Sequence, residues 1–162
     1  MPQNSENSLE VLLGEQLKTK GWTLATAESC TGGNIAHRIT LISGSSTYFK
    51  GGVVSYSNEV KIGVLKVPAF AIAMHGAVSE EVVRAMAKGV SDLMSVNCVV
   101  AVSGIAGPDG GTPEKPVGTV WICTQCNNNQ VAVKYQLNGD RNANIEQTTR
   151  LGIEQLLGQM EG

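Results

Sequence analysis

The amino-acid sequence predicts an α/β fold: a single-domain, three-layer α/β/α sandwich with a mixed sheet. Strand-like and helical patterns alternate over the first two thirds of the chain, as they do in βαβ units. Residues 97–103 form a nearly continuous apolar run, typical of a strand buried on both faces. Two later strand-like segments, 118–124 and 130–137, are joined by Asn127-Asn128-Asn129, which indicates a hairpin. With no linker and no internal repeat, residues 1–162 are expected to form one domain.

The first half of the chain is expected to alternate helix and strand twice. A first helix is marked by leucines at helical spacing, and Gly21 marks its end; the leucines are Leu9, Leu12, Leu13 and Leu17. Residues 23–27 predict a short strand. A second helix follows Gly32-Gly33 and is marked by Ile35, Ile39 and Ile42. Residues 49–56 predict another strand, which ends at Tyr56, and residues 58–65 a short helix that Asn58 could cap.

The second half contains two longer helices. Ser79 is expected to cap the first, with acidic residues in its first turn and an apolar stripe of Val82, Met86, Val90 and Leu93. A loop rich in glycine and proline follows the apolar strand, over residues 104–116. The last helix begins after Asp140, and its inward face is expected to carry Ile145, Thr149, Ile153 and Leu156.

The composition argues against several classes of partner. The formal charge is −2 and the basic residues are scattered, so the chain lacks the basic surface of a nucleic-acid binder. No apolar run is long enough to span a bilayer, and residues 1–10 are too polar for a secretory signal. The four cysteines lack the spacing of a disulfide framework, which favours a cytoplasmic protein. A charged fraction of only 16% leaves room for an oligomer interface, and a homodimer is favoured.

Residues 26–33, Thr-Ala-Glu-Ser-Cys-Thr-Gly-Gly, are the first candidate for chemistry. They lie between a predicted strand and a predicted helix, where α/β proteins place their sites. Ser29 is therefore a candidate nucleophile, and the N–H groups that open the helix are candidate oxyanion donors. The alternative is that Ser29 only caps the helix, because serine is a favoured cap residue.

A serine nucleophile needs a base, and the sequence offers few. The two histidines are unpromising, since His37 lies within a helix and His75 precedes a glycine in a loop, where it could cap the C-terminus of a helix. Lys61 is the other candidate, because a buried lysine can lose its proton at moderate pH. It follows Tyr56 and Asn58 closely enough for the phenol and the amine to reach the same sheet edge as Ser29. The alternative is an ordinary surface lysine.

The segment 103–111, Ser-Gly-Ile-Ala-Gly-Pro-Asp-Gly-Gly, is a third candidate. Glycines directly after a buried strand let the backbone approach a ligand, and successive N–H groups can bind phosphate. A long surface connection is the alternative. Cys123-Thr124-Gln125-Cys126, by contrast, lacks the second ligand pair of a zinc site and the strand-to-helix setting of a redox pair. We therefore expect no metal and no cofactor.

Taken in order, these segments resemble one family, the C-terminal domain of the competence-damage-inducible protein A (CinA) group. The resemblance covers nearly the whole chain, through six ordered blocks: residues 26–33, 52–61, 75–79, 103–111, 115–120 and 139–141. Larger members of the family carry an additional N-terminal domain with a pyrophosphatase activity. This chain does not match that domain, so the pyrophosphatase activity is not expected here.

The resemblance implies amide hydrolysis of nicotinamide mononucleotide to nicotinate mononucleotide and ammonia, in pyridine nucleotide recycling. Ser29 matches the family's nucleophile and Lys61 its general base, with Tyr56 as their hydrogen-bonding companion. Substrate contacts are expected from the turn after Ser29, from the glycine loop and from a few further residues: Cys30, Thr31, Gly32, Ser45, Ser46, Asn58, Ser103, Gly104, Ile105, Ala106, Gly107 and Arg141. Two alternatives stay open: a nucleotide-binding module without catalysis, and a Ser-Lys amidase or peptidase that acts on another small amide.

Overall fold

The computed structural model describes residues 8–162, so most of the polar N-terminal stretch considered above lies outside the described residues. Its centre is a five-stranded sheet in the order β2-β1-β3-β4-β5. β1 (Leu24–Glu28) pairs in parallel with β2 (Phe49–Val54) and with β3 (Cys98–Gly104). β4 (Thr119–Cys126) and β5 (Asn129–Gln136) continue the sheet as an antiparallel hairpin. The predicted mixed sheet is confirmed.

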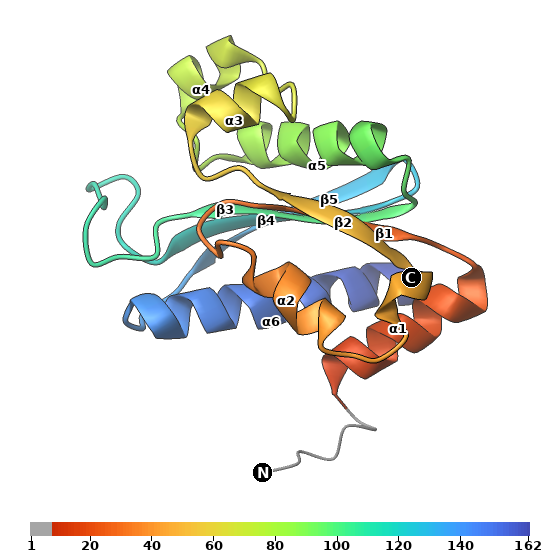
Figure 1. Cartoon of the computed structure of the whole chain (residues 1–162). Helices are drawn as coiled ribbons and strands as arrows, with labels where there is room; N and C mark the ends of the chain where they lie inside the picture. The colour runs from red at the N-terminus through yellow and green to blue at the C-terminus, as the bar shows by residue number, and fades with distance from the viewer. Residues whose placement is uncertain (1–7) are drawn as a thin grey trace.

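Helices cover both faces of this sheet (Figure 1). One layer, drawn below the sheet, contains α1 (Leu9–Lys20), α2 (Asn34–Thr40) and α6 (Arg141–Glu161). The layer above contains α3 (Asn58–Gly63), α4 (Ala69–His75) and α5 (Glu80–Met94). A 3₁₀ turn, η2 (Ser45–Thr47), leads from α2 into β2. Within residues 8–162, none of the helices is long and apolar enough to cross a membrane.

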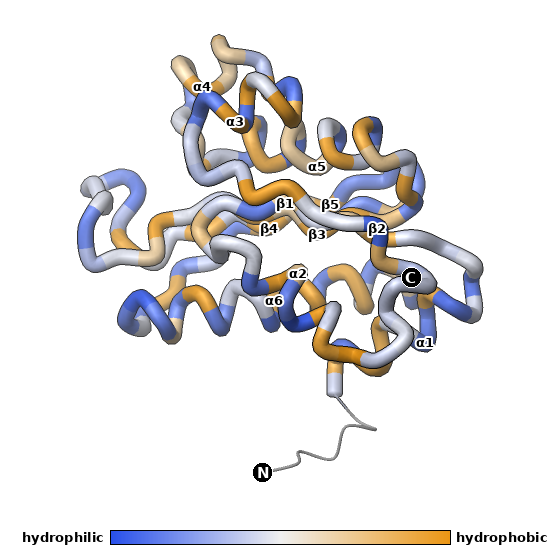
Figure 2. The backbone as a smooth tube through the Cα atoms, viewed as in Figure 1, coloured by the Kyte–Doolittle hydropathy of each residue, from blue (hydrophilic) through white to orange (hydrophobic). Residues whose placement is uncertain are grey.

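The sheet separates two apolar cores because successive side chains of a strand point to opposite faces. Along β3, Val100 and Val102 pack toward α1, α2 and α6, whereas Val99 and Ala101 pack toward α5. All four are fully buried. The hydropathy colours of Figure 2 follow this arrangement, with hydrophobic stretches of the central strands enclosed between the helices. The nearly continuous apolar run in the sequence is therefore explained by burial on both faces.

Most of the predicted helix ends are confirmed by their hydrogen bonds. Ser79 caps α5, and its hydroxyl accepts a bond from the N–H of Val82. Asp140 caps α6 in the same way through the N–H of Ala143. Gly21 ends α1 in the left-handed conformation, with φ = 67°, which glycine adopts without strain.

Local differences from the expectations occur between β2 and α5. β2 ends at Val54, so Tyr56 lies beyond the strand, and the cap of α3 is Ser57 rather than Asn58. His75 is the last residue of α4, a seven-residue helix that the sequence did not reveal because so short a segment shows no periodicity. Leu93 was expected to face inward, but at the end of α5 it is 54% exposed.

Candidate active site

Ser29 lies in a tight turn between β1 and α2, at the carboxyl end of a central strand. It is 7% exposed. Its hydroxyl does not cap α2, because the cap position is occupied by Gly33 and has no side-chain hydrogen bond. Instead, the Oγ of Ser29 lies 3.0 Å from the Nζ of Lys61. The alternative in which Ser29 is a helix cap is therefore wrong.

Lys61 reaches Ser29 from the other helical layer. Although α3 has only six residues, the side chain of Lys61 is 2% exposed, whereas most lysines keep their amine in water. Its Nζ also donates a hydrogen bond of 2.7 Å to the carbonyl of Ser55. Burial lowers the pKa of the Lys61 amine, because a dry site disfavours the charged form. A neutral amine with one N–H on Ser55 can direct its lone pair at the serine hydroxyl.

Cys30, beside Ser29, is a second potential nucleophile in the same turn. Burial raises the pKa of the Cys30 thiol to about 12. Because the thiolate is the reactive form, a thiol with this pKa is almost entirely unreactive at neutral pH. Ser29, which has a base within hydrogen-bonding distance, is the better candidate.

Of the three N–H groups expected as oxyanion donors, at Cys30, Thr31 and Gly32, those of Cys30 and Thr31 have no acceptor within residues 8–162. The N–H of Gly32, which was expected to join them, donates to the carbonyl of Ser29. The hydroxyl of Thr31 donates to the carboxylate of Glu28. The candidate oxyanion donors are thus narrowed to two adjacent N–H groups.

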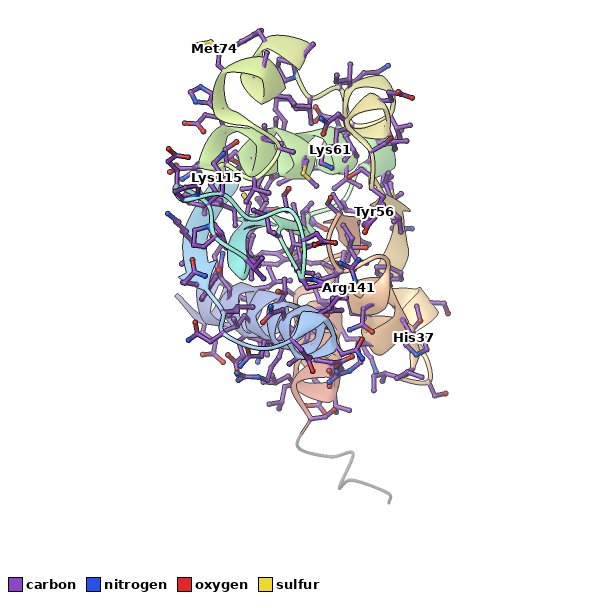
Figure 3. The ribbon with its side chains drawn as sticks, turned by 90° about the vertical axis from the view of Figure 1, so that its left-hand side faces the viewer. His37, Tyr56, Lys61, Met74, Lys115 and Arg141 are labelled. Atoms are coloured by element: carbon purple, nitrogen blue, oxygen red, sulfur yellow. The ribbon has the colours of Figure 1, made fainter. Side chains whose placement is uncertain are left out.

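Tyr56 lies at the mouth of the site and is 61% exposed. Its hydroxyl accepts a hydrogen bond of 2.9 Å from Arg141, at the start of α6. In Figure 3, Tyr56 lies between Lys61 above and Arg141 below. Within the described residues its hydroxyl has no hydrogen bond to Lys61 or Ser29, although these were its expected partners.

The glycine loop after β3 is held from the side of α6. The guanidinium of Arg141 donates to the carbonyl of Gly107 at 2.7 Å, and the buried amide of Asn144 donates to the carbonyl of Ala106 at 3.0 Å. Because the N–H and C=O of a trans peptide point in opposite directions, the N–H of Gly107 points away from Asn144. Ser103 does not face a ligand freely, since its hydroxyl donates to the carbonyl of Ala77.

These segments enclose a cavity of about 280 Å³. It is lined by most of the residues expected from the sequence: Ser29, Cys30, Tyr56, Asn58, Lys61, Ser103, Gly104, Ile105, Ala106, Gly107 and Arg141. Ala77, Val78, Asp109 and Gly110 complete the lining. Thr31 and Gly32 are not among the lining residues, and Ser45 and Ser46 lie in η2, also outside it.

Neither histidine lines the cavity. His37 is exposed on α2 and lies well away from Lys61 in Figure 3. His75, at the end of α4, has Glu81 as its charged neighbour, 3.8 Å away. The low expectation for both histidines as the base is consistent with these positions, and Lys61 is the basic group that contacts Ser29.

Cys123 and Cys126 cannot act as a pair. They are three residues apart in β4, so their side chains lie on opposite faces and belong to different apolar cores. Cys126 instead faces Cys98 across the antiparallel ladder. Within residues 8–162, no three side chains of histidine, cysteine, aspartate or glutamate are grouped as metal ligands would be.

Three buried polar residues beside the site were not found from the sequence: Glu28, Ser55 and Asn144. All are buried polar side chains, with exposures of 1%, 0% and 1%. Glu28 and Asn144 each make several hydrogen bonds to the backbone. Glu28 lies in the segment that drew attention to Ser29, but its polarity alone gave no sign of its burial.

Fold and site together define a three-layer α/β protein with a buried serine–lysine pair at the carboxyl edge of its sheet. A family model described as the CinA C-terminal domain matches residues 6–160. The chain belongs to this family, as the motifs in its sequence indicated.

Two relatives of similar length carry an enzymatic name. "Nicotinamide-nucleotide amidohydrolase PncC" of Pseudomonas putida is 45% identical, over 93% of this chain and 94% of that protein. The protein of the same name from Enterobacter agglomerans is 49% identical over 88% of each chain. A "CinA-like protein" of Cytophaga hutchinsonii is 48% identical over 88% of this chain, which spans about a third (34%) of that relative.

Solved structures support the assignment of the chain to the CinA family. A CinA superfamily protein from Klebsiella pneumoniae has a TM-score of 0.92 at 35% identity, covering 98% of this chain and 99% of that chain. A competence/damage inducible protein from Agrobacterium tumefaciens has a TM-score of 0.92 at 36% identity, covering 95% and 94%. Agreement over nearly the full length of both confirms the three-layer fold.

Proposed function

We propose that this chain hydrolyses the carboxamide of nicotinamide mononucleotide, giving nicotinate mononucleotide and ammonia for pyridine nucleotide recycling. The observation that carries the proposal is the buried pair, with the Nζ of Lys61 3.0 Å from the Oγ of Ser29 and 2% of Lys61 exposed. The two amidohydrolases of similar length named above support the same reaction and substrate.

In the proposed mechanism, neutral Lys61 takes the proton of Ser29 as the serine oxygen attacks the carboxamide carbon. The N–H groups of Cys30 and Thr31 then bind the oxyanion of the tetrahedral intermediate. The Lys61 ammonium returns the proton to the departing nitrogen, so that ammonia leaves and an acyl-enzyme remains. Water, deprotonated by the same amine, attacks this ester, and the proton goes back to Ser29 as the acid is released.

The phosphate of the substrate is assigned to the end of the cavity near Arg141. The guanidinium is already held by Tyr56 and Gly107, so little conformational entropy is lost when it binds an anion. The N–H of Gly107, directed away from Asn144, is a second candidate donor. Tyr56 therefore takes part in this proposal as a holder of Arg141, in place of its expected hydrogen bond to Lys61.

Ammonia release tests the proposal when nicotinamide mononucleotide is compared with nicotinamide, nicotinamide riboside and NAD. We expect kcat/KM for the riboside to be lower by about tenfold or more for each charge-assisted bond lost, since such bonds contribute about 1.5–3 kcal/mol. Equal values for riboside and mononucleotide would remove the phosphate assignment. If the protein hydrolyses only another amide, the result would favour a different Ser-Lys amidase. If it binds nicotinamide mononucleotide without hydrolysing it, the result would favour a nucleotide-binding module.

We further propose that the chain is cytoplasmic and forms a homodimer. Phe70 and Met74 on α4 are 69% and 73% exposed, and large apolar side chains on one short helix favour contact with a second copy. Light scattering of the purified protein tests this association, and a monomer at micromolar concentration would contradict it.

A further inference from the structure

Glu28 is the last residue of β1 and directly precedes Ser29, yet its carboxylate does not line the cavity. The side chain is 1% exposed and accepts three hydrogen bonds. One oxygen accepts from the hydroxyl of Thr31 at 2.6 Å and from the N–H of Ile35 at 2.9 Å, and the other accepts from the N–H of Ala36 at 3.0 Å. Both oxygens of a buried carboxylate are therefore occupied by groups from one short segment.

These bonds complete the start of α2. The cap position of α2 is Gly33, which has no side chain, so the first turn of the helix needs an acceptor from elsewhere. Glu28 supplies it from the end of the strand, with a negative charge at the positive end of the helix dipole. The turn over residues 29–33, which contains Ser29 and both candidate oxyanion donors, is thus fixed at each end by the same residue.

The backbone of Glu28 extends this arrangement toward the base. Its carbonyl accepts hydrogen bonds from the N–H of Ser55 at 2.7 Å and from the hydroxyl of Ser55 at 3.2 Å. The carbonyl of Ser55 in turn accepts from the Nζ of Lys61. Glu28 therefore joins the turn of Ser29 to the residue that orients Lys61.

We propose that Glu28 is a positioning residue, whose carboxylate sets the place of the Ser29 hydroxyl and of the Cys30 and Thr31 N–H groups relative to Lys61. It acts through these groups and does not touch the substrate. This inference rests on the proposed function, in that Ser29 is taken as the nucleophile. It predicts a defect in the chemical step, with binding left intact.

Glu28→Gln tests the inference because the amide has nearly the same shape. The remaining oxygen can still accept from Thr31 and Ile35, but the new NH₂ group faces the N–H of Ala36, so one bond is lost. We expect kcat for nicotinamide mononucleotide to fall by about 10- to 100-fold, since small displacements of reacting groups have effects of this size. KM should change by less than about threefold, because Arg141 and the glycine loop are untouched.

Ser8→Ala is the matched control. Ser8 caps α1, accepting from the N–H of Val11 in the same helical layer, and lies outside the cavity. Each variant removes one cap bond, so both are expected to lower Tm, whereas only Glu28→Gln should lower kcat. If Glu28→Gln does not fold, Thr31→Val removes one of the three bonds to the carboxylate and should lower kcat in the same direction.

A second measurement separates this inference from the choice of substrate. The rate at which a fluorophosphonate labels Ser29 reports on the nucleophile without any nucleotide. We expect Glu28→Gln to slow this labelling about as much as it slows kcat. A Glu28→Gln protein with a lowered Tm but wild-type kcat and labelling rate would show that Glu28 only caps α2.

The labelling rate also separates a wrong substrate from a wrong role for Glu28. If the wild type is labelled at Ser29 yet releases no ammonia from the mononucleotide, the substrate is wrong. The labelling rates of Glu28→Gln and Ser8→Ala then still decide the role of Glu28. A wild type that is neither labelled at Ser29 nor able to release ammonia from the mononucleotide overturns both proposals.

Discussion

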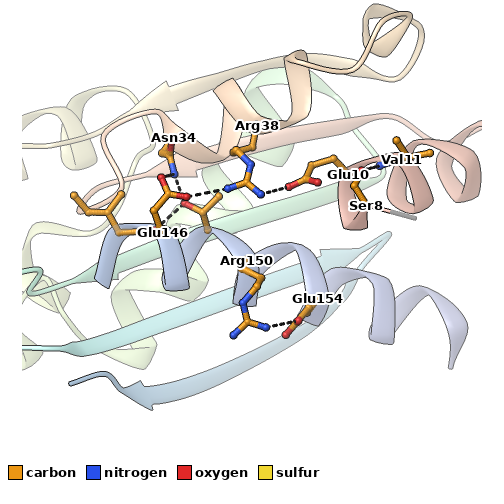
Figure 4. Close-up of polar contacts among 10 residues, drawn as sticks. Ser8, Glu10, Val11, Asn34, Arg38, Glu146, Arg150 and Glu154 are labelled. Atoms are coloured by element: carbon orange, nitrogen blue, oxygen red, sulfur yellow. Dashed lines mark hydrogen bonds and ion pairs between the residues drawn. The ribbon is translucent and has the colours of Figure 1, made fainter. Parts of the chain in front are cut away.

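Ser29 and Lys61 belong to opposite helical layers, and the two layers hold their residues by different means. The layer of Ser29 is joined by polar bridges (Figure 4). Arg38 of α2 contacts Glu10 of α1 at 2.7 Å and Glu146 of α6 at 2.9 Å. The layer of Lys61 begins with two short helices, α3 and α4, which expose three large apolar side chains to solvent: Ile62, Phe70 and Met74.

This difference indicates which property each layer controls. Ser29 is fixed in place by directional hydrogen bonds, so changes around it should alter the geometry of attack. Lys61 is held by its own burial and by two hydrogen bonds, so changes around it should alter the pKa of its amine. The site depends on both layers, because a serine hydroxyl is a weak nucleophile without a base.

The largest expected effect tests whether the two layers act as one unit. Ser29→Ala and Lys61→Met should each lower kcat by about 10⁴-fold or more, and the double variant should be little worse than either alone. Each substitution leaves the apolar cores intact, so circular dichroism should show folded proteins. Wild-type turnover by a folded Ser29→Ala protein would end the proposed mechanism, and additive losses would mean that the two residues act separately.

A smaller effect concerns the pH dependence of the base. Lys61 must be neutral to accept a proton, and burial lowers its pKa. We therefore expect kcat/KM to rise about tenfold per pH unit below that pKa and to level off above it, at a pH below the ordinary lysine value of about 10.4. Steady-state kinetics over about pH 6–10 measures this profile. A kcat/KM that stays flat across the range would argue against Lys61 as the base.

The same shift predicts a change in stability. Between the lowered pKa of the folded protein and the ordinary pKa of about 10.4, the unfolded chain binds more protons at Lys61 than the folded chain does. The free energy of unfolding of the wild type should therefore rise with pH relative to Lys61→Met, by at most about 1.4 kcal/mol per pH unit. Urea unfolding of both proteins at several pH values measures the difference. A difference that falls with pH would mean that the pKa is raised in the fold.

The smallest expected effect on activity concerns two cysteines of β4 that lie outside the cavity. Cys123→Ala/Cys126→Ala should keep wild-type kcat and KM, because neither residue lines the cavity and they face different cores. Chelators and reducing agents should likewise leave activity unchanged. Ammonia release with and without EDTA or dithiothreitol checks this. Bound zinc that is lost together with activity would contradict it.

The sequence predicted the parts of the molecule that depend on periodicity and turn chemistry. The apolar run of β3, the stripe of α5 up to Val90 and the caps at Ser79 and Asp140 follow from local rules, and the structure confirms them. The three candidate segments also meet at one cavity, because each follows a strand whose carboxyl end lies at the same sheet edge.

What the sequence could not predict depends on contacts between distant residues. The partner of Tyr56 is 85 positions away in the chain, and its pairing with Arg141 leaves no local pattern. Ser55 and Asn144 act as buried polar links, and a serine or an asparagine in a sequence is far more often exposed. Helix α4 was missed because its seven residues are too few to display a periodic pattern.

The length of α6 has a practical consequence for tethering the protein. The helix begins at Arg141, beside the cavity, and continues for 21 residues to Glu161. At 1.5 Å per residue it spans about 30 Å, so its last turn lies far from Ser29. A surface, a fluorophore or a second folded unit attached at the last turn of α6 would therefore leave the entrance of the cavity open, and this end of the helix is the natural point for immobilisation.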